Sequence, residues 1–268
     1  MIKITNNAGF FACCSIKLTK IAQFINTNNR LPDVVDSSEQ FEWYKNNINK
    51  DKDITLDYFE NYNNIRDINE IQGPINYDTE KQFENFSVLD YNSLTPLIKK
   101  YFSPSLEITE MINNIEKNYN LTSPLIYENI CVLYYRGNDK NGETPKCSYD
   151  EYLKYTDKLL EKNKNLKFLI QSDETEFIEF MINKFPKNSF YFINEIRHMK
   201  KCNDTVDRRM KHLNYEFSKK YLAITIIMSK CKYIICGSGN CDIWIMLYRG
   251  NNKNVIQNCN GNWYNTVL

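Results

Sequence analysis

The segment Ile130–Lys140, with the sequence ICVLYYRGNDK, decides how this chain is expected to fold. Its first half is apolar and rich in β-branched and aromatic residues, which predicts a buried strand. Ligands of open α/β sheets bind just beyond the carboxyl ends of the strands. Arg136 therefore stands where a phosphate group would lie, and Gly137 lets the backbone approach it closely. An ordinary strand followed by a polar turn has the same pattern, so this segment alone does not identify a site.

Two later segments repeat the pattern of an apolar run that ends in polar residues. Lys167–Glu174 reads KFLIQSDE, and Lys232–Asn240 reads KYIICGSGN. Apolar residues recur at helical spacing between and after these runs, over 149–162, 174–184, 222–228 and 242–248. Strands that alternate with helices indicate a parallel, doubly wound sheet. The polar ends of the three strands would gather at one edge of that sheet, which favours a binding site over three unrelated turns.

The N-terminal part of the chain carries a weaker signal of the same kind. Met1–Thr5 is expected to form a strand, Gly9 and Phe10 follow in a loop, and Ser15–Asn26 has the apolar spacing of a helix. This order of elements occurs in nucleotide-binding turns, although a plain β–turn–α connection fits the residues equally well. Further expected elements are a strand over 31–36 and a helix over 106–119.

Composition excludes several classes of protein. The chain has 268 residues, of which 42% are hydrophobic, and a formal net charge of +1. A nearly neutral chain has no electrostatic reason to bind nucleic acid or an anionic membrane surface. No apolar stretch approaches the ~20 residues of a membrane span, and no signal peptide is recognisable. We therefore expect a folded cytoplasmic protein without a nucleic-acid partner or a membrane span.

Signals for a metal site are weak. The nine cysteines include no Cys-x-x-Cys pair, which is typical of reduced, mostly buried thiols. The two histidines, His198 and His212, add no ligand pair. A basic loop over Met199–Met210, with Lys211 next to it, could guide an anionic ligand, but a solvated surface is the simpler interpretation. We expect no metal.

Three motifs together resemble the α1,6- and protein O-fucosyltransferase superfamily. The first is Tyr134-x-Arg-Gly-Asn-Asp-Lys140, followed by Gly142-Glu143 and Tyr149-x-x-Tyr. It is similar to the family's His-x-Arg-Arg-x-Asp-Lys pattern, which precedes a Gly-x-Glu and a helix. Gln171–Glu174 resembles the second motif, a strand that ends in Thr-Asp-Asp, and Ser229–Ser238 resembles the third, which leads into a phosphate loop. The order and spacing of the motifs agree over about residues 128–250.

The resemblance implies a GT-B-like α/β fold, with two Rossmann-like domains facing across a cleft. Residues 1–121 would be the acceptor-side domain and residues 122–268 the domain that binds a GDP-sugar. The implied activity is inverting, metal-independent transfer, without a cofactor, of fucose from GDP-fucose to a hydroxyl of a glycan or protein. Asp51-x-Asp53 matches the metal-binding motif of another glycosyltransferase architecture, but no apolar strand precedes it, so a solvated loop is the better interpretation.

The chain departs from the family pattern in three places. Tyr134 stands where the family usually has His, Gly137 replaces the second Arg, and Leu222–Thr225 lacks the acid that reads guanine. Glu216 or a backbone carbonyl would then have to recognise the base. Such losses also fit a catalytically inactive sugar-nucleotide or glycan-binding module, and a transferase that uses another nucleotide sugar is a further alternative.

The resemblance also implies roles for particular residues. Arg136 would neutralise the charge that grows on the leaving diphosphate, since its planar fork matches phosphate oxygens. Glu143 lies one residue from the family's Gly-x-Glu position and is the first choice for the base that deprotonates the acceptor hydroxyl. Asp139 is the second choice, and Lys140 would hold a carboxylate or a phosphate. The expected donor-binding residues are Gly9, Phe10, Tyr134, Arg136, Asp173, Thr225, Gly237, Ser238, Gly239 and Asn240.

Overall fold

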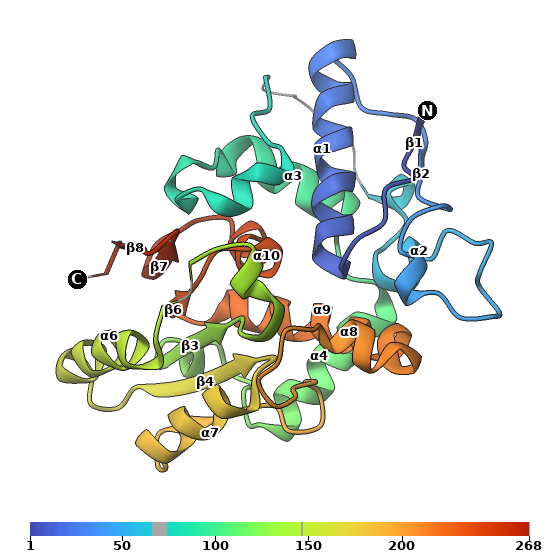
Figure 1. The fold of residues 1–268 in the computed structure, drawn as a ribbon. Helices are drawn as coiled ribbons and strands as arrows, with labels where there is room; N and C mark the ends of the chain where they lie inside the picture. Colours follow the sequence, from blue (N-terminus) through green and yellow to red (C-terminus); the bar gives the residue numbers. More distant parts are fainter. Residues whose placement is uncertain (66–73, 146, 268) are drawn as a thin grey trace.

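A mainly parallel sheet organises the computed structural model, which describes residues 1–65, 74–145 and 147–267 (Figure 1). Its strand order is β5-β4-β3-β6-β7-β8, and all neighbours are parallel except β7 and β8. The order changes direction between β3 and β6, as it does in doubly wound nucleotide-binding sheets. The predicted α/β class is confirmed. The strands are β3 (Ile130–Tyr135), β4 (Lys167–Ser172), β5 (Ser189–Phe190), β6 (Tyr233–Cys236), β7 (Val255–Cys259) and β8 (Asn262–Asn265).

The helices that connect these strands divide between the two faces of the sheet. They are α6 (Tyr149–Lys162), α7 (Thr175–Lys184), α9 (Asn214–Lys230) and α10 (Asn240–Arg249). Right-handed crossovers put α6 and α7 on one face and α9 and α10 on the other, and each pair is in contact. Ser148 and Glu151 form a capping box at the start of α6. Gly250, with φ of 72°, ends α10 in the left-handed conformation that glycine adopts readily.

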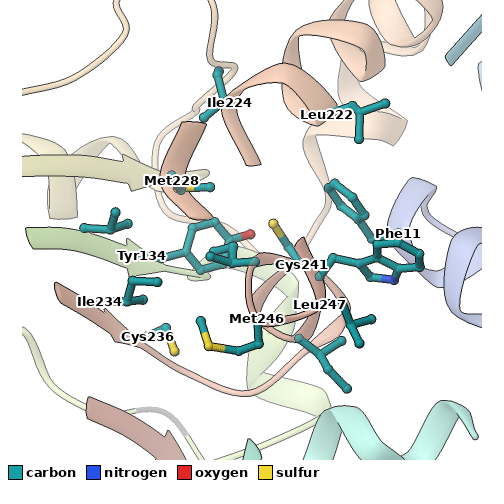
Figure 2. Packing of buried hydrophobic residues seen from close by; sticks show 14 of the residues in the cluster. Phe11, Tyr134, Leu222, Ile224, Met228, Ile234, Cys236, Cys241, Met246 and Leu247 are labelled. Atoms are coloured by element: carbon teal, nitrogen blue, oxygen red, sulfur yellow. The ribbon is translucent and has the colours of Figure 1, made fainter. Parts of the chain in front are cut away.

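The N-terminal part forms a smaller β–α–β unit that packs on the large sheet's helices. Strands β1 (Ile2–Lys3) and β2 (Val35–Asp36) are parallel, with α1 (Phe10–Asn28) between them. Helix α1 packs against α10, and α4 (Leu106–Asn118) packs against α9. Figure 2 shows Phe11 of α1 in one apolar cluster with side chains of β3, β6, α9 and α10.

Trp244 of α10 anchors this shared core. Its ring centroid lies 6.0 Å from that of Phe11 and 4.7 Å from that of Phe102. Its indole Nε1 donates to Ser15 Oγ at 2.9 Å. The predicted domain division at residues 121 and 122 stays a prediction. Helix α4 precedes this boundary and packs on α9, which follows it.

Several predicted boundaries differ from the structure for identifiable reasons. Helix α1 begins at Phe10, well before the expected Ser15, because Phe10 and Phe11 are both buried against neighbouring aromatic rings. Strands β1 and β2 have two residues each, since each pairs only with the other. The helix expected over 222–228 lies in the C-terminal half of α9.

Strands β7 and β8 were not expected. The apolar run of β7 is only Val255–Ile256, and the buried Gln257 and Asn258 follow it. Gln257 is tolerated there because its amide accepts from Phe86 N and donates to Glu84 O.

The remaining elements are short, apart from α3. Among the described residues, no helix is both long and apolar enough to cross a membrane. The remaining helices are α2 (Thr55–Tyr58), α3 (Tyr91–Tyr101), α5 (Pro124–Tyr127) and α8 (Val206–Arg209). The 3₁₀ turns are η1 (Glu42–Tyr44), η2 (Tyr62–Asn64), η3 (Thr79–Phe83), η4 (Phe86–Val88), η5 (Asn138–Gly142) and η6 (Lys211–Leu213).

Candidate functional site

The main cavity, of about 330 Å³, lies at the carboxyl ends of β3 and β4, where the strand order reverses. Its walls come from the first turn of α1, the ends of β3 and β4, turn η5, the segment before α9, and the first turn of α10. Cavities of this size hold small organic ligands, and the switch point is where doubly wound sheets bind them. The main cavity is therefore the candidate site.

Arg136 is held rigidly at the edge of the main cavity by two carboxylates. Its Nε donates to Asp173 Oδ2 and its Nη2 to Asp139 Oδ1, each at 3.1 Å. Asp173 is nearly buried and also accepts from the backbone N–H of Gly137 at 2.8 Å. Within the described parts of the chain, Arg136 Nη1 has no hydrogen-bond partner. The fixed guanidinium thus keeps N–H groups for a ligand.

Gly137 is required by a carboxylate buried beneath it. A Cβ at this position would lie 2.6 Å from the carboxyl carbon of Glu174 and 2.7 Å from its Cβ. Glu174 is fully buried; it accepts from Asn138 N at 3.2 Å and from the hydroxyl of Tyr149. The second Arg of the family motif has no room here. The departure from the motif at Gly137 thus follows from local packing.

Lys140 and Asp242 meet at the turn between β6 and α10. Lys140 Nζ donates to Glu143 Oε2, and Asp242 Oδ1 accepts from Gly237 N at 3.1 Å. A Cβ at Gly239 would lie 3.3 Å from Lys140 Nζ and 3.1 Å from Asp242 Oδ2. Burial raises the pKa of Asp242 to about 7, although the positive charges of Lys140 and Arg136 offset part of this effect.

Most of the residues expected at the site line the main cavity. They are Gly9, Phe10, Tyr134, Arg136, Asp139, Lys140, Glu143, Asp173, Gly239 and Asn240. Gly237 and Ser238 instead border a small cavity of about 30 Å³, which also touches Arg136, Lys140 and Asp242. Thr225 reaches neither cavity, because it is fully buried and its hydroxyl donates to Tyr221 O at 2.8 Å. Glu216, named as a possible base reader, does not line them either.

A chain of hydrogen bonds beside the main cavity joins the start of α1 and the turn η1 to the segment before α9. The N–H of Phe10 donates to the hydroxyl of Tyr44 at 2.7 Å, and this hydroxyl donates to Asp207 Oδ2 at 2.7 Å. Arg197 donates to Asp207 Oδ1 at 2.6 Å and to Asn214 Oδ1 at 2.7 Å. The start of α1 is thereby fixed against the segment that precedes α9.

Sequence reasoning missed the segment that carries Arg197 and Asp207. A solvated surface was the simpler interpretation of the basic residues in this region, and they are indeed exposed, but Arg208 also lines the main cavity together with Thr205, Val206 and Asp207. Asp242 was also missed, although an acid three positions into a helix that follows a Gly-Ser-Gly turn is a recognisable signal. The cavity lining contains four cations and six carboxylates. These are Arg136, Lys140, Arg197 and Arg208, and Asp139, Glu143, Asp173, Glu195, Asp207 and Asp242.

Asp51 and Asp53 lie outside both cavities. Asp53 accepts from Ser37 N at 2.8 Å and from Thr55 N at 2.9 Å, which fixes the turn before α2. Over residues 1–65, 74–145 and 147–267, no group of three or more His, Cys, Asp or Glu side chains is arranged to hold a metal ion.

No protein-family model and no curated protein matches the chain. Two solved structures that it resembles are crystal structures of NodZ alpha-1,6-fucosyltransferase, one soaked with GDP-fucose and one co-crystallised with GDP. The first is 14% identical, with a TM-score of 0.38, over 60% of this chain and 47% of that chain. The second is 13% identical, with a TM-score of 0.36, over 63% and 49%. The chain thus spans about half the length of these structures. The predicted resemblance to fucosyltransferases is confirmed, and it concerns the fold alone.

Proposed function

We propose that this chain binds a nucleoside diphosphate sugar in the main cavity and transfers the sugar, with inversion and without a metal, to a hydroxyl group. GDP-fucose is the proposed donor, and a glycan or protein hydroxyl is the proposed acceptor. The observation that carries the proposal is Arg136. It stands at the switch point of the sheet, held by Asp139 and Asp173, with N–H groups left for phosphate oxygens.

The first turn of α10 supports this placement of the diphosphate. Gly239 and Asn240 line the main cavity opposite the end of β3, at the N-terminus of a ten-residue helix. The free N–H groups and the dipole at such a helix end favour an anion. When the bond to the sugar breaks, negative charge grows on the diphosphate, and Arg136 with this helix end would stabilise it.

Glu143 is the proposed base that accepts the proton of the attacking hydroxyl. Its side chain is 44% exposed, lines the main cavity and is hydrogen-bonded to Lys140. It can therefore reach an acceptor that enters from solvent. Asp139 is less suited, because its side chain is only 23% exposed and helps to hold Arg136. The acceptor would lie against the N-terminal side of the cavity, where Trp43 is 37% exposed.

The guanine of the donor would be recognised differently from the family pattern. Ile224 stands in the region where the family carries an acid, and it is fully buried inside α9. The base would therefore be read by side chains of the cavity wall. Gln171, Glu195 and Phe217 line this wall and offer an amide, a carboxylate and an aromatic face.

A second candidate function is an inactive module that binds a sugar nucleotide or a glycan. Two observations favour it: carboxylates outnumber cations in the lining of the main cavity, and Gly137 leaves no room for a second Arg. A module of this kind would bind donor and release no GDP from it.

A thermal-shift series tests the proposal. GDP and GDP-fucose should stabilise the protein, by about 2.7 kcal/mol at 100 times the dissociation constant, and EDTA should not change the effect. UDP-glucose serves as the matched control and should have little effect. Stabilisation by UDP-sugars alone, or its loss in EDTA, would overturn the proposal. GDP release from GDP-fucose then separates the enzyme from the inactive module.

A further inference from the structure

Asp242 is a buried carboxyl group that borders both cavities. Asp242 is 2% exposed and lies in the first turn of α10. Its Oδ1 accepts a hydrogen bond from Gly237 N. The positive charges that act on it are those of Lys140 and Arg136. Both side chains line the main cavity, where the proposed diphosphate would lie. Asp242 and the ligand would therefore share one pair of positive charges.

The cysteine and tyrosine side chains around Asp242 keep their protons near neutral pH. Burial raises the pKa of the Cys147 thiol to about 12 and that of the Cys241 thiol to about 11. Burial likewise raises the pKa of Cys236, of Tyr134 and of Tyr152 well above the ordinary value. Within this cluster, Asp242 is the group whose charge changes close to pH 7. The groups that face Asp242 come from three parts of the fold. Tyr134, Arg136 and Lys140 lie in β3, just after it and in η5. Cys147 and Tyr152 lie before and within α6, and Cys236 and Cys241 lie in β6 and α10.

We propose that Asp242 takes up a proton from solvent when a nucleoside diphosphate sugar binds in the main cavity, so that donor binding by this chain is coupled to pH. The inference rests on the proposed function. A bound diphosphate brings negative charge toward Asp242 and competes for Lys140 and Arg136. Both effects disfavour the ionised carboxylate, and a new O–H bond on Asp242 removes the repulsion. Asp242 thus acts as a positioning residue, since it sets the charge that the diphosphate meets.

The sign of the coupling follows from linkage. At about pH 5.5 Asp242 is already protonated in the free protein, so binding takes up no proton there and is tightest. Above pH 7 the free protein has lost the proton and the complex regains it. The affinity then falls as pH rises, by up to about tenfold per pH unit while one full proton is taken up.

Calorimetric titration with GDP-fucose tests this coupling. The diphosphate of this probe is esterified at both ends, so it has no proton to exchange between about pH 6 and about pH 8. Titrations at about pH 7.5–8, in two buffers of different ionisation enthalpy, should show uptake approaching one proton per ligand. Asp242→Asn keeps an oxygen that accepts from Gly237 N, and it should lose both the proton uptake and the fall in affinity. Asp157→Asn, an exposed carboxyl on α6, is the matched control and should behave as the wild type.

The outcomes separate this inference from the proposed function. If GDP-fucose does not bind the wild type, the proposed function fails. If it binds with no net proton uptake at about pH 8, the inference fails, and no variant is needed to reach that conclusion. Equal uptake by wild type and Asp242→Asn would also overturn it.

Discussion

The carboxyl group of Glu174 fills the space where a side chain at position 137 would lie. A Cβ on Gly137 would be 2.6 Å from the Glu174 carboxyl carbon, and this carboxylate is itself fixed by Asn138 N and Tyr149. The glycine is therefore a consequence of a buried acid just beyond the end of the neighbouring strand β4. The turn that presents Arg136 can follow β3 directly because residue 137 has no side chain.

Gly137→Ala should destabilise the protein, because the new methyl group must displace a buried, hydrogen-bonded carboxylate. The expected loss is about 1–3 kcal/mol in the free energy of unfolding, as for other overpacked sites, and urea denaturation measures it. Gly142→Ala is the control, since a Cβ there meets nothing within 4 Å. Equal stability of the two variants would show that Glu174 moves aside without cost.

Tyr44→Phe should weaken the connection between the start of α1 and the segment before α9. Its hydroxyl is buried and serves both Phe10 N and Asp207, so removing it leaves a buried donor and a partly buried carboxylate each short of one partner. The expected loss of stability is about 1–3 kcal/mol, measured by thermal denaturation. Tyr264→Phe removes an exposed hydroxyl on β8 and should have no such effect. A neutral result for Tyr44→Phe would mean that the hydrogen-bond chain contributes nothing to the fold.

Asp242→Asn should stabilise the ligand-free protein at alkaline pH. Burial raises the pKa of Asp242 from 3.8 to about 7 in the folded protein. This group therefore makes its full contribution to the stability of the wild type below pH 3.8, and the contribution is lost as the pH rises through 7. The variant carries no such loss. At pH 8 the difference should be on the order of 4 kcal/mol in favour of the variant, and it should vanish toward pH 4. Denaturation of both proteins across this range checks it, and parallel curves would contradict the assignment.

Glu143→Gln should separate donor binding from transfer. Glu143 contacts Lys140 and is not one of the partners of Arg136, so GDP-fucose affinity should be nearly unchanged. The rate of GDP release, with an acceptor that the wild type uses, should fall by about 10²–10⁴-fold, the usual contribution of a general base. Asp139→Asn should instead weaken binding, because it loosens Arg136. An unchanged kcat in Glu143→Gln would remove this residue from the mechanism.

Much of the sheet was predictable because its central strands are apolar on both sides. Strands β3, β4 and β6 are almost wholly buried, and each ends in a polar turn, so a one-dimensional pattern is enough to find them. Strand β7 was missed because the buried polar residues Gln257 and Asn258 interrupt its apolar pattern, and the partners of Gln257 lie far away in the sequence. No local sequence pattern predicts such a pairing.

The site was predictable where its residues follow strands and not where they depend on tertiary contacts. Arg136 and Asp173 come directly after strands, and Gly239 is the third residue after β6, at the same edge of the sheet. Arg197 lies in an irregular segment and Asp207 in the short helix α8. Their position depends on Tyr44 and Asn214, so their place in the cavity wall could not be read from spacing. Thr225 was misplaced because a residue's depth within α9 depends on which face packs on the sheet.

Calorimetric titration of GDP-fucose into wild type and Arg136→Ala is the most direct test of the central claim, that Arg136 holds a donor diphosphate. The variant loses a charge-assisted pair worth about 1.5–3 kcal/mol, so binding should weaken by about 10–150-fold. Arg136→Lys should recover only part of this, since an ammonium group cannot reproduce the fork. Arg30→Ala, at an exposed ion pair beyond the end of α1, should bind as the wild type does. Equal affinity of wild type and Arg136→Ala would contradict the account and place the donor elsewhere.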